Sequence, residues 1–110
     1  MAFEVVLTSG FKRNLKKIAK KHRHILKDIS MLIEEIAENP YSGTDLGQDV
    51  YKIRLSVTGT FKGKSGGARV ITYVKITNET VILAEIYLKS EFDTVNVNTV
   101  LSRLIDEGYL

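Results

Sequence analysis

Residues 51–74 read YKIRLSVTGTFKGKSGGARVITYV, which predicts two β-strands on either side of a glycine-rich, basic loop. Side chains alternate along the first strand, so Lys52, Arg54 and Ser56 share one face while apolar residues occupy the other. Between Asp49 and Glu79 the chain has no acidic residue but six basic ones: Lys52, Arg54, Lys62, Lys64, Arg69 and Lys75. A sheet face with this charge imbalance is suited to binding an anion.

The segment before these strands has helical periodicity. Apolar residues recur with helical spacing in 11–36, after a predicted strand at 3–7 that is followed by capping and turn residues. One helix of about 30 residues would be roughly 45 Å long, more than the diameter of a compact domain of this size. We therefore predict two antiparallel helices that turn between Lys21 and His24, and we expect Asn39-Pro40 to end the second.

The remaining elements follow from alternation and turn chemistry. Residues 41–48 are predicted to be a polar connection, and residues 80–88 a third strand after a turn at 77–79. In that strand, strict alternation places Ile82, Ala84, Ile86 and Leu88 on one face. Asn96 or Asn98 can cap a last helix that ends at Gly108. The predicted order is β-α-α-β-β-β-α: an α+β fold with an antiparallel sheet, a helical hairpin and a C-terminal helix.

Length and composition limit the classes of protein. The 110 residues, 44% hydrophobic and 26% charged, predict a single domain over 1–110. The absence of cysteine excludes disulfides and thiolate chemistry, and no apolar run is long enough for a membrane span. We therefore expect a soluble, cytoplasmic protein.

Two motifs that could suggest ligand binding do not support it. Gly59 and Gly63 enclose three residues where a phosphate-binding P-loop needs four, and the chain continues as a strand, so nucleotide binding is not predicted. His22 and His24 have no further histidine or cysteine with which to complete a metal shell, so no metal site is expected. The row Lys12, Lys16 and Lys20 on the first helix fits either a solvated face or attachment to a nucleic-acid backbone.

The strongest cluster consists of cations from three strands: Lys52, Arg54, Arg69, Lys89, with Tyr87 beside them. Lys52 and Arg54 lie two residues apart on one face, so their side chains leave the strand about 7 Å apart. Arginine forks can bind the non-bridging oxygens of a phosphodiester, and a lysine crowded by arginines would have a lowered pKa, as a general base needs. The same cluster could bind an acidic segment without chemistry.

The segments YKIRL, GKSGGARVITYV and AEIYLKSEFDTV, in this element order, resemble the RelE/ParE superfamily of type II toxin–antitoxin toxins, on the RelE/HigB branch. The resemblance spans nearly the whole chain and implies a microbial-RNase-like fold. It further implies a ribosome-dependent mRNA interferase that cuts mRNA in the A site, inhibits translation, uses neither metal nor cofactor, and is neutralised by a cognate antitoxin. The 2′-hydroxyl would attack the adjacent phosphate, leaving a 2′,3′-cyclic phosphate and a 5′-hydroxyl.

The resemblance also assigns roles to individual residues. Lys52 takes the general-base or charge-stabilising role, Arg54 matches the second basic residue of that strand, and Arg69 matches the phosphate-binding arginine. Lys62 and Lys64 would contact the RNA backbone.

The chain departs from the family pattern after the third strand. Ser90 and about Asn96 stand where the best-known members have an arginine and a tyrosine, so Lys89 and Tyr87 are the candidates for the general acid. This departure leaves open two alternatives: a ParE-like gyrase inhibitor, or an inactive RNA- or antitoxin-binding module with the same fold.

Overall fold

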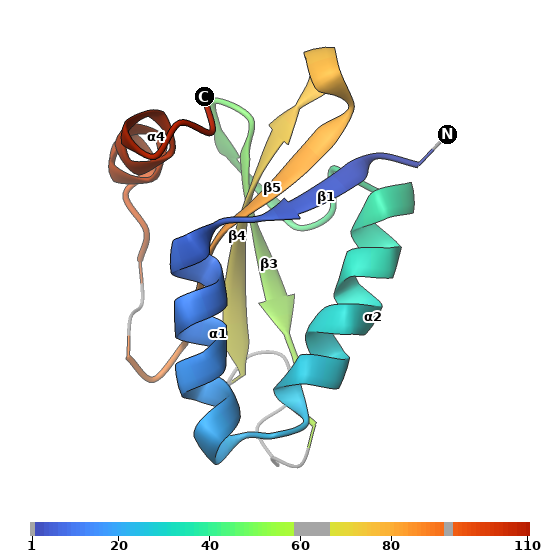
Figure 1. The fold of residues 1–110 in the computed structure, drawn as a ribbon, viewed down its shortest axis with the longest axis vertical. Helices are drawn as coiled ribbons and strands as arrows, with labels where there is room; N and C mark the ends of the chain where they lie inside the picture. The colour runs from blue at the N-terminus through green and yellow to red at the C-terminus, as the bar shows by residue number, and fades with distance from the viewer. Residues whose placement is uncertain (1, 59–66, 92–93) are drawn as a thin grey trace.

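The computed structural model describes residues 2–58, 67–91 and 94–110. In these ranges five strands form one sheet of order β1-β5-β4-β3-β2, with helices on both of its faces (Figure 1). The elements are β1 (Glu4–Leu7), α1 (Ser9–Lys21), α2 (Ile25–Glu38), β2 (Thr44–Gly47), β3 (Val50–Leu55), β4 (Ala68–Lys75), a 3₁₀ turn (Ile76–Asn78), β5 (Thr80–Leu88) and α4 (Val97–Asp106). The α+β fold is the one predicted from the sequence.

The helix ends follow the predicted capping chemistry. The hydroxyl of Thr8 accepts a hydrogen bond from the Phe11 amide at the start of α1, and Asn96 Oδ1 accepts one from the Thr99 amide at the start of α4. The chain turns between α1 and α2 at residues 22–24, as expected from the size of the domain. The histidines of this turn, His22 and His24, flank the two helix ends.

The sheet differs from the prediction in two respects. Residues 41–48 are not only a connection, because Thr44–Gly47 forms the edge strand β2, which pairs antiparallel with β3. In addition, β1 joins the opposite side of the sheet parallel to β5, so the sheet is mixed. The strand β2 escaped prediction because a four-residue polar segment with a terminal glycine has no alternating pattern, and short polar strands are common at sheet edges.

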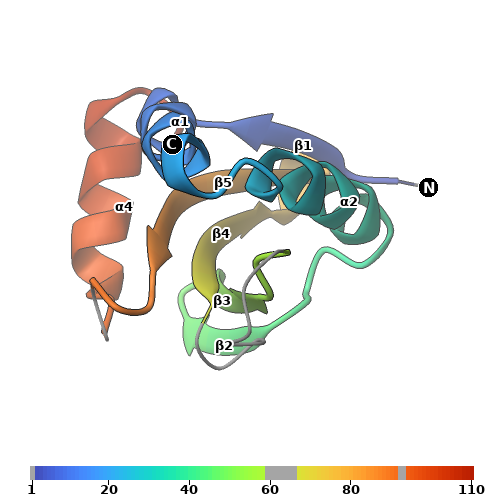
Figure 2. The same cartoon turned by 90° about the horizontal axis from the view of Figure 1, so that it is seen from below.

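Two apolar clusters cover the two faces of the sheet. On one face α1 and α2 pack over the sheet through residues that include Phe11, Ile25 and Ile36, and these contact Ile53, Val70 and other strand residues. On the other face Val100 and Leu104 of α4 pack with Ile71 and Tyr87, among others. Figure 2 shows α1 and α2 on one side of the strands and α4 beside β5.

A bulge in β5 decides which face its last residues occupy. Ile71 pairs with Glu85 but Thr72 pairs with Leu83, so Ala84 is an extra residue in the ladder. Ile86 therefore packs in the same cluster as Val81 and Leu83, with Leu88 against it, instead of sharing a face with Ile82 and Ala84. The strict alternation predicted for this strand was wrong at the bulge, and the bulge turns Tyr87 toward the α4 face.

Candidate functional site

The centre of the candidate site is a row of three side chains from adjacent strands. Arg54 of β3 pairs with Arg69 of β4, and Arg69 pairs with Tyr87 of β5. We call Arg54, Arg69 and Tyr87 the cross-strand row. Directly opposed residues lie about 5 Å apart and on the same side of a sheet, so the row extends over roughly 10 Å.

The row lies on the face of the sheet that α1 and α2 do not cover. The neighbouring row, Ile53, Val70 and Ile86, is in register across the same strands and is buried in the cluster beneath α1 and α2. Side chains alternate between faces, so Arg54, Arg69 and Tyr87 point to the other side. The arginines of two predicted strands therefore converge, as the sequence pattern suggested.

The three members of the row differ in exposure. Arg54 is exposed, whereas Arg69 has only 5% of its surface accessible and Tyr87 only 6%. Arg69 Nη1 donates a hydrogen bond to the Ala68 carbonyl oxygen at 3.1 Å, which fixes the guanidinium close to its own strand. Like charges that face each other across strands repel, so the opposed positions of Arg54 and Arg69 favour an anion beside them.

The other predicted catalytic residues are less central. Lys52 is half-buried, lies on the same face as Arg54, and pairs with Ile71, which belongs to the cluster on the α4 side. Lys89 is exposed and lies one residue beyond β5, where its amide donates a hydrogen bond to the Gly67 carbonyl oxygen at 3.0 Å. The structure thus brings Lys52 beside the row and leaves Lys89 at its end.

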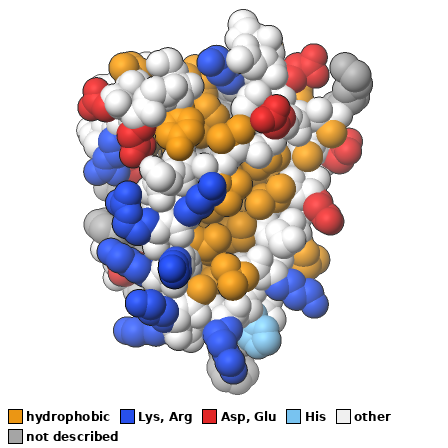
Figure 3. Space-filling view, viewed as in Figure 1, with side chains coloured by type: hydrophobic (Ala, Val, Ile, Leu, Met, Phe, Trp, Pro, Cys, Tyr) orange, Lys and Arg blue, Asp and Glu red, His pale blue; other side chains and the backbone are white. Residues whose placement is uncertain are grey.

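The predicted RNA-binding lysines fall into two sets. Lys62 and Lys64 lie outside the described residues. Lys12, Lys16 and Lys20 are exposed on α1, over which lysine and arginine side chains gather in Figure 3. A face this basic is compatible with a nucleic-acid backbone but also with plain solvation.

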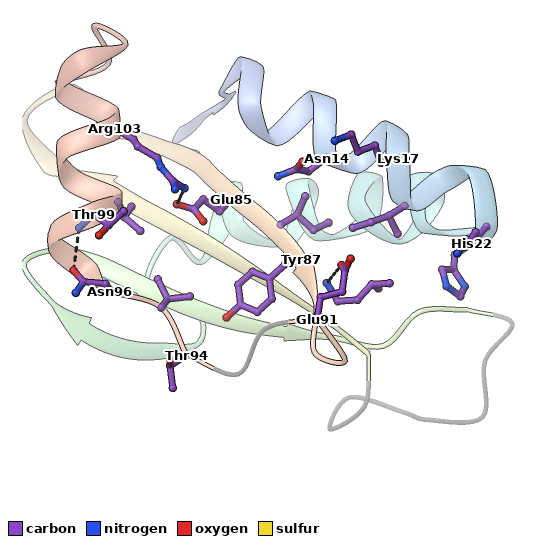
Figure 4. Close-up of a pocket in the computed structure, with 16 residues that line it drawn as sticks. Asn14, Lys17, His22, Glu85, Tyr87, Glu91, Thr94, Asn96, Thr99 and Arg103 are labelled. Carbon is purple, nitrogen blue, oxygen red and sulfur yellow. Dashed lines mark hydrogen bonds and ion pairs between the residues drawn. The ribbon is translucent and has the colours of Figure 1, made fainter.

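A cleft that the sequence did not reveal lies next to the row, between α1 and α4 at the edge of β5. It has a volume of about 530 Å³ and is lined by residues from both helices, β5 and the segment before α4, including Lys17, Lys21, Tyr87 and Arg103 (Figure 4). We call it the α1–α4 cleft. Its α1 wall is more than 60 residues from its β5 and α4 walls in the chain, so no local pattern could have indicated it.

Within the described ranges no group of three or more histidine, cysteine or acidic side chains could hold a metal ion. None of the helices described is long and apolar enough to cross a membrane.

This architecture defines a class of small α+β proteins in which a sheet carries a helical pair on one face and a basic row on the other. The family model of the RelE toxin of the RelE/RelB toxin–antitoxin system matches residues 10–102. The chain therefore belongs to the RelE toxin family, the toxin component of type II toxin–antitoxin systems.

Solved structures show the same fold. A double-arginine mutant of the Escherichia coli RelE toxin in the free state aligns with a TM-score of 0.60 and 18% identity over 96% of this chain and 97% of that one. The isolated E. coli RelE toxin aligns with a TM-score of 0.59 and 20% identity over 94% of this chain and 99% of that one. A RelBE toxin–antitoxin complex from Mycobacterium tuberculosis aligns with a TM-score of 0.52 and 18% identity over 80% of this chain and 99% of that one.

One curated sequence also matches. The DNA repair protein RAD50 of Saccharomyces cerevisiae is 44% identical over 57 residues, which are 51% of this chain and 4% of that protein. The chain spans so little of that protein that the match carries no argument about function.

Proposed function

We propose that this protein is a ribosome-dependent mRNA endoribonuclease that cuts its substrate at the cross-strand row. The observation that carries the proposal is the register that sets Arg54 opposite Arg69 and Arg69 opposite Tyr87 on the face of the sheet that α1 and α2 do not cover. Membership of the RelE toxin family supports the same class of activity.

In the proposed reaction Lys52 takes the proton of the ribose 2′-hydroxyl, whose oxygen attacks the adjacent phosphorus. Arg54 and Arg69 stabilise the additional negative charge on the non-bridging oxygens, as preorganised donors do in other phosphoryl and acyl transfers. Tyr87 donates its proton to the departing 5′-oxygen. The bond from phosphorus to the 5′-oxygen breaks, and the products are a 2′,3′-cyclic phosphate and a 5′-hydroxyl.

We assign the general-acid role to Tyr87 and not to Lys89 because of its place in the row, and the substrate must reach a Tyr87 hydroxyl that is buried in the free protein. Tyr87 lies directly opposite Arg69, whereas Lys89 is exposed beyond the end of β5. The best-known family members have an arginine after the third strand and a tyrosine at the start of the last helix, where this chain has Ser90 and about Asn96. With Tyr87 as the general acid, neither of those residues is needed.

We also propose a cognate antitoxin, the ribosome and mRNA as partners. Two of the structural matches are toxin–antitoxin complexes, from E. coli and M. tuberculosis, and they support the first of these. Antitoxin binding would keep the toxin inactive in the cell.

The proposal is tested by expressing the protein without antitoxin and sequencing transcript ends. We expect growth arrest with mRNA cut within codons, and we expect Arg54→Gln to remove both effects at equal protein level. Lys75→Gln is the matched control, since it removes the same charge from β4 at the end of the sheet away from the row. Intact transcripts together with DNA damage would instead support gyrase inhibition, and a complete lack of toxicity would support an inactive binding module.

A further inference from the structure

We propose that the α1–α4 cleft holds the nucleotide on the 3′ side of the cut, with its 3′-phosphate against Lys17 and Lys21. The inference rests on the proposed function, because it takes its direction along the RNA from the role given to Tyr87. It assigns to this cleft a substrate subsite separate from the cross-strand row.

The position of Tyr87 links the two sites. Tyr87 ends the row on β5 and its side chain also lines the α1–α4 cleft, while its hydroxyl oxygen is buried in the free protein (Figure 4). If Tyr87 protonates the departing 5′-oxygen, the nucleotide that owns this oxygen lies on the Tyr87 side of the scissile phosphate. That nucleotide is the one 3′ of the cut, and the space beside Tyr87 is the cleft.

The cleft exists because β1 is shorter than β5. β1 pairs with β5 only as far as Leu83, so Ile86 and Leu88 lie at an edge that no strand covers in the described ranges. α1 and α4 stand on either side of this edge. The cleft volume of about 530 Å³ falls within the range typical of small-molecule sites, roughly 300–1,000 Å³.

The lining suits a nucleoside. Ile18, Ile86, Leu88 and Val100 provide an apolar surface on which a base can pack, and Asn14 and Asn96 bring amide groups to the rim. An apolar wall with a few polar groups that fix orientation is the usual composition of a ligand site.

The charge in the cleft comes from α1. Arg103 forms an ion pair with Glu85 at 3.0 Å, so its charge is already balanced. Glu91 Oε1 accepts a hydrogen bond from the Leu88 amide at 3.4 Å and lies away from Arg103, on the His22 side of the cleft (Figure 4). Lys17 and Lys21, one helical turn apart and both exposed, are the cations left to meet a phosphate, with His22 beside them.

This assignment divides the lysines of α1 by face. Lys12 and Lys16 lie on the same helix and are also exposed, but they do not line the cleft. The pairs Lys17/Lys21 and Lys12/Lys16 therefore carry the same charge and spacing in different places, which provides a matched control.

The test is an NMR titration of the whole protein with adenosine 3′-monophosphate, with adenosine as the uncharged comparison. We expect shifts at residues of the cleft and tighter binding of the 3′-phosphate. Lys17→Gln/Lys21→Gln should weaken that binding roughly tenfold, since hydrogen bonds to charged groups are lost. Lys12→Gln/Lys16→Gln should leave it within about twofold of the wild type, which is the shift expected from screened charges beyond contact distance.

Lys17→Gln/Lys21→Gln is then assayed with ribosomes programmed with mRNA, beside Lys75→Gln as the control for lost charge, because Lys12 and Lys16 are themselves predicted to contact RNA. We expect Lys17→Gln/Lys21→Gln to raise KM more than it lowers kcat, because the cleft binds but does not react. Equal losses of 3′-monophosphate binding in both double variants, or no binding of the 3′-monophosphate by the wild type, would overturn the inference. Cleavage that is lost in Arg54→Gln but unchanged in Lys17→Gln/Lys21→Gln would overturn the assignment of the cleft as a substrate subsite and leave the proposed function in place. Nucleotide binding in the cleft by a protein that cuts no RNA would overturn the proposed function and with it the 3′ assignment, but would leave the cleft as a nucleotide-binding site.

Discussion

Gly43 holds the backbone of the candidate site in place. Its φ is +96°, a region that side chains rarely adopt, and a Cβ at this position would lie 2.4 Å from the carbonyl oxygen of Lys52. The glycine thus allows the chain entering β2 to pass directly against β3 at the proposed general base. A side chain here would have to move the strand, because the atom it meets belongs to the backbone.

We predict that Gly43→Ala destabilises the protein by roughly 3 kcal/mol, the combined cost of a strained φ and overpacking. It should also reduce RNA cleavage under conditions where the protein is still folded, because Lys52 is displaced. Gly47→Ala is the control: its φ is +92° but nothing lies within 4 Å of the added Cβ. Urea unfolding should show a loss of only about 1 kcal/mol for Gly47→Ala. Equal losses for the two variants would show that the contact with Lys52 has no effect.

Asp28 ties α2 to the end of the β3 segment. Its carboxylate accepts two hydrogen bonds from Thr58, one from the amide at 2.8 Å and one from the hydroxyl at 2.5 Å. Thr58 is the last described residue before position 67, so this contact fixes the chain where it leaves the sheet.

We predict that Asp28→Ala costs about 1 kcal/mol, because hydrogen bonds to a charged acceptor are the stronger ones but this pair is partly exposed. A double-mutant cycle with Thr58→Val isolates the hydroxyl contact, and we expect a coupling energy of about 0.5 kcal/mol or more. Additive losses in the cycle would mean that the hydroxyl bond does not contribute.

The attachment of α4 is expected to depend on apolar packing and not on its ion pair. The Arg103 side chain is 63% exposed, so its pairing with Glu85 is screened by solvent. Val100 and Leu104, in contrast, are 1% and 2% exposed. These burial values predict that the two apolar residues hold the helix.

Leu104→Ala should therefore destabilise the protein by about 2–5 kcal/mol, while Arg103→Gln should change the free energy of unfolding by less than about 1 kcal/mol. Thermal or urea unfolding measures both. A larger loss for Arg103→Gln than for Leu104→Ala would show that the ion pair holds α4.

The elements that the sequence predicted well are those with a long periodic pattern or a local cap. The apolar residues of α1 and α2, the Thr8 cap and the Asn96 cap depend on neighbours in the chain. The strand β2 and the bulge at Ala84 depend on pairing with distant strands. Nothing in a short polar segment or in a regular alternation indicates either of them.

Part of the candidate site could be predicted from the sequence and part could not. Arg54 and Arg69 could be predicted to converge because they lie on adjacent strands with a clear inside and outside. The α1–α4 cleft could not, because it forms only when the last helix packs beside the first. Arg103 and Lys21, which both line this cleft, are connected by no sequence pattern.

The two faces of the sheet differ in what they carry. The face under α1 and α2 buries the larger apolar cluster, whereas the other face has Arg54, Arg69 and Lys52 beside the smaller cluster of α4. Substitutions in the row should therefore change activity more than folding, with Arg54 the safest of the three because it is exposed. That property makes Arg54 the most informative position for a direct test.

The central claim is that one RNA linkage is cut at the cross-strand row, and the most direct measurement is end-group analysis of mRNA on programmed ribosomes. We predict fragments with 2′,3′-cyclic phosphate and 5′-hydroxyl ends from the wild type. The cleavage rate should fall by roughly 10²–10³ in Arg54→Gln and by roughly 10²–10⁴ in Tyr87→Phe, with folding intact. Wild-type rates in both variants, or fragments with 5′-phosphate ends, would contradict the claim.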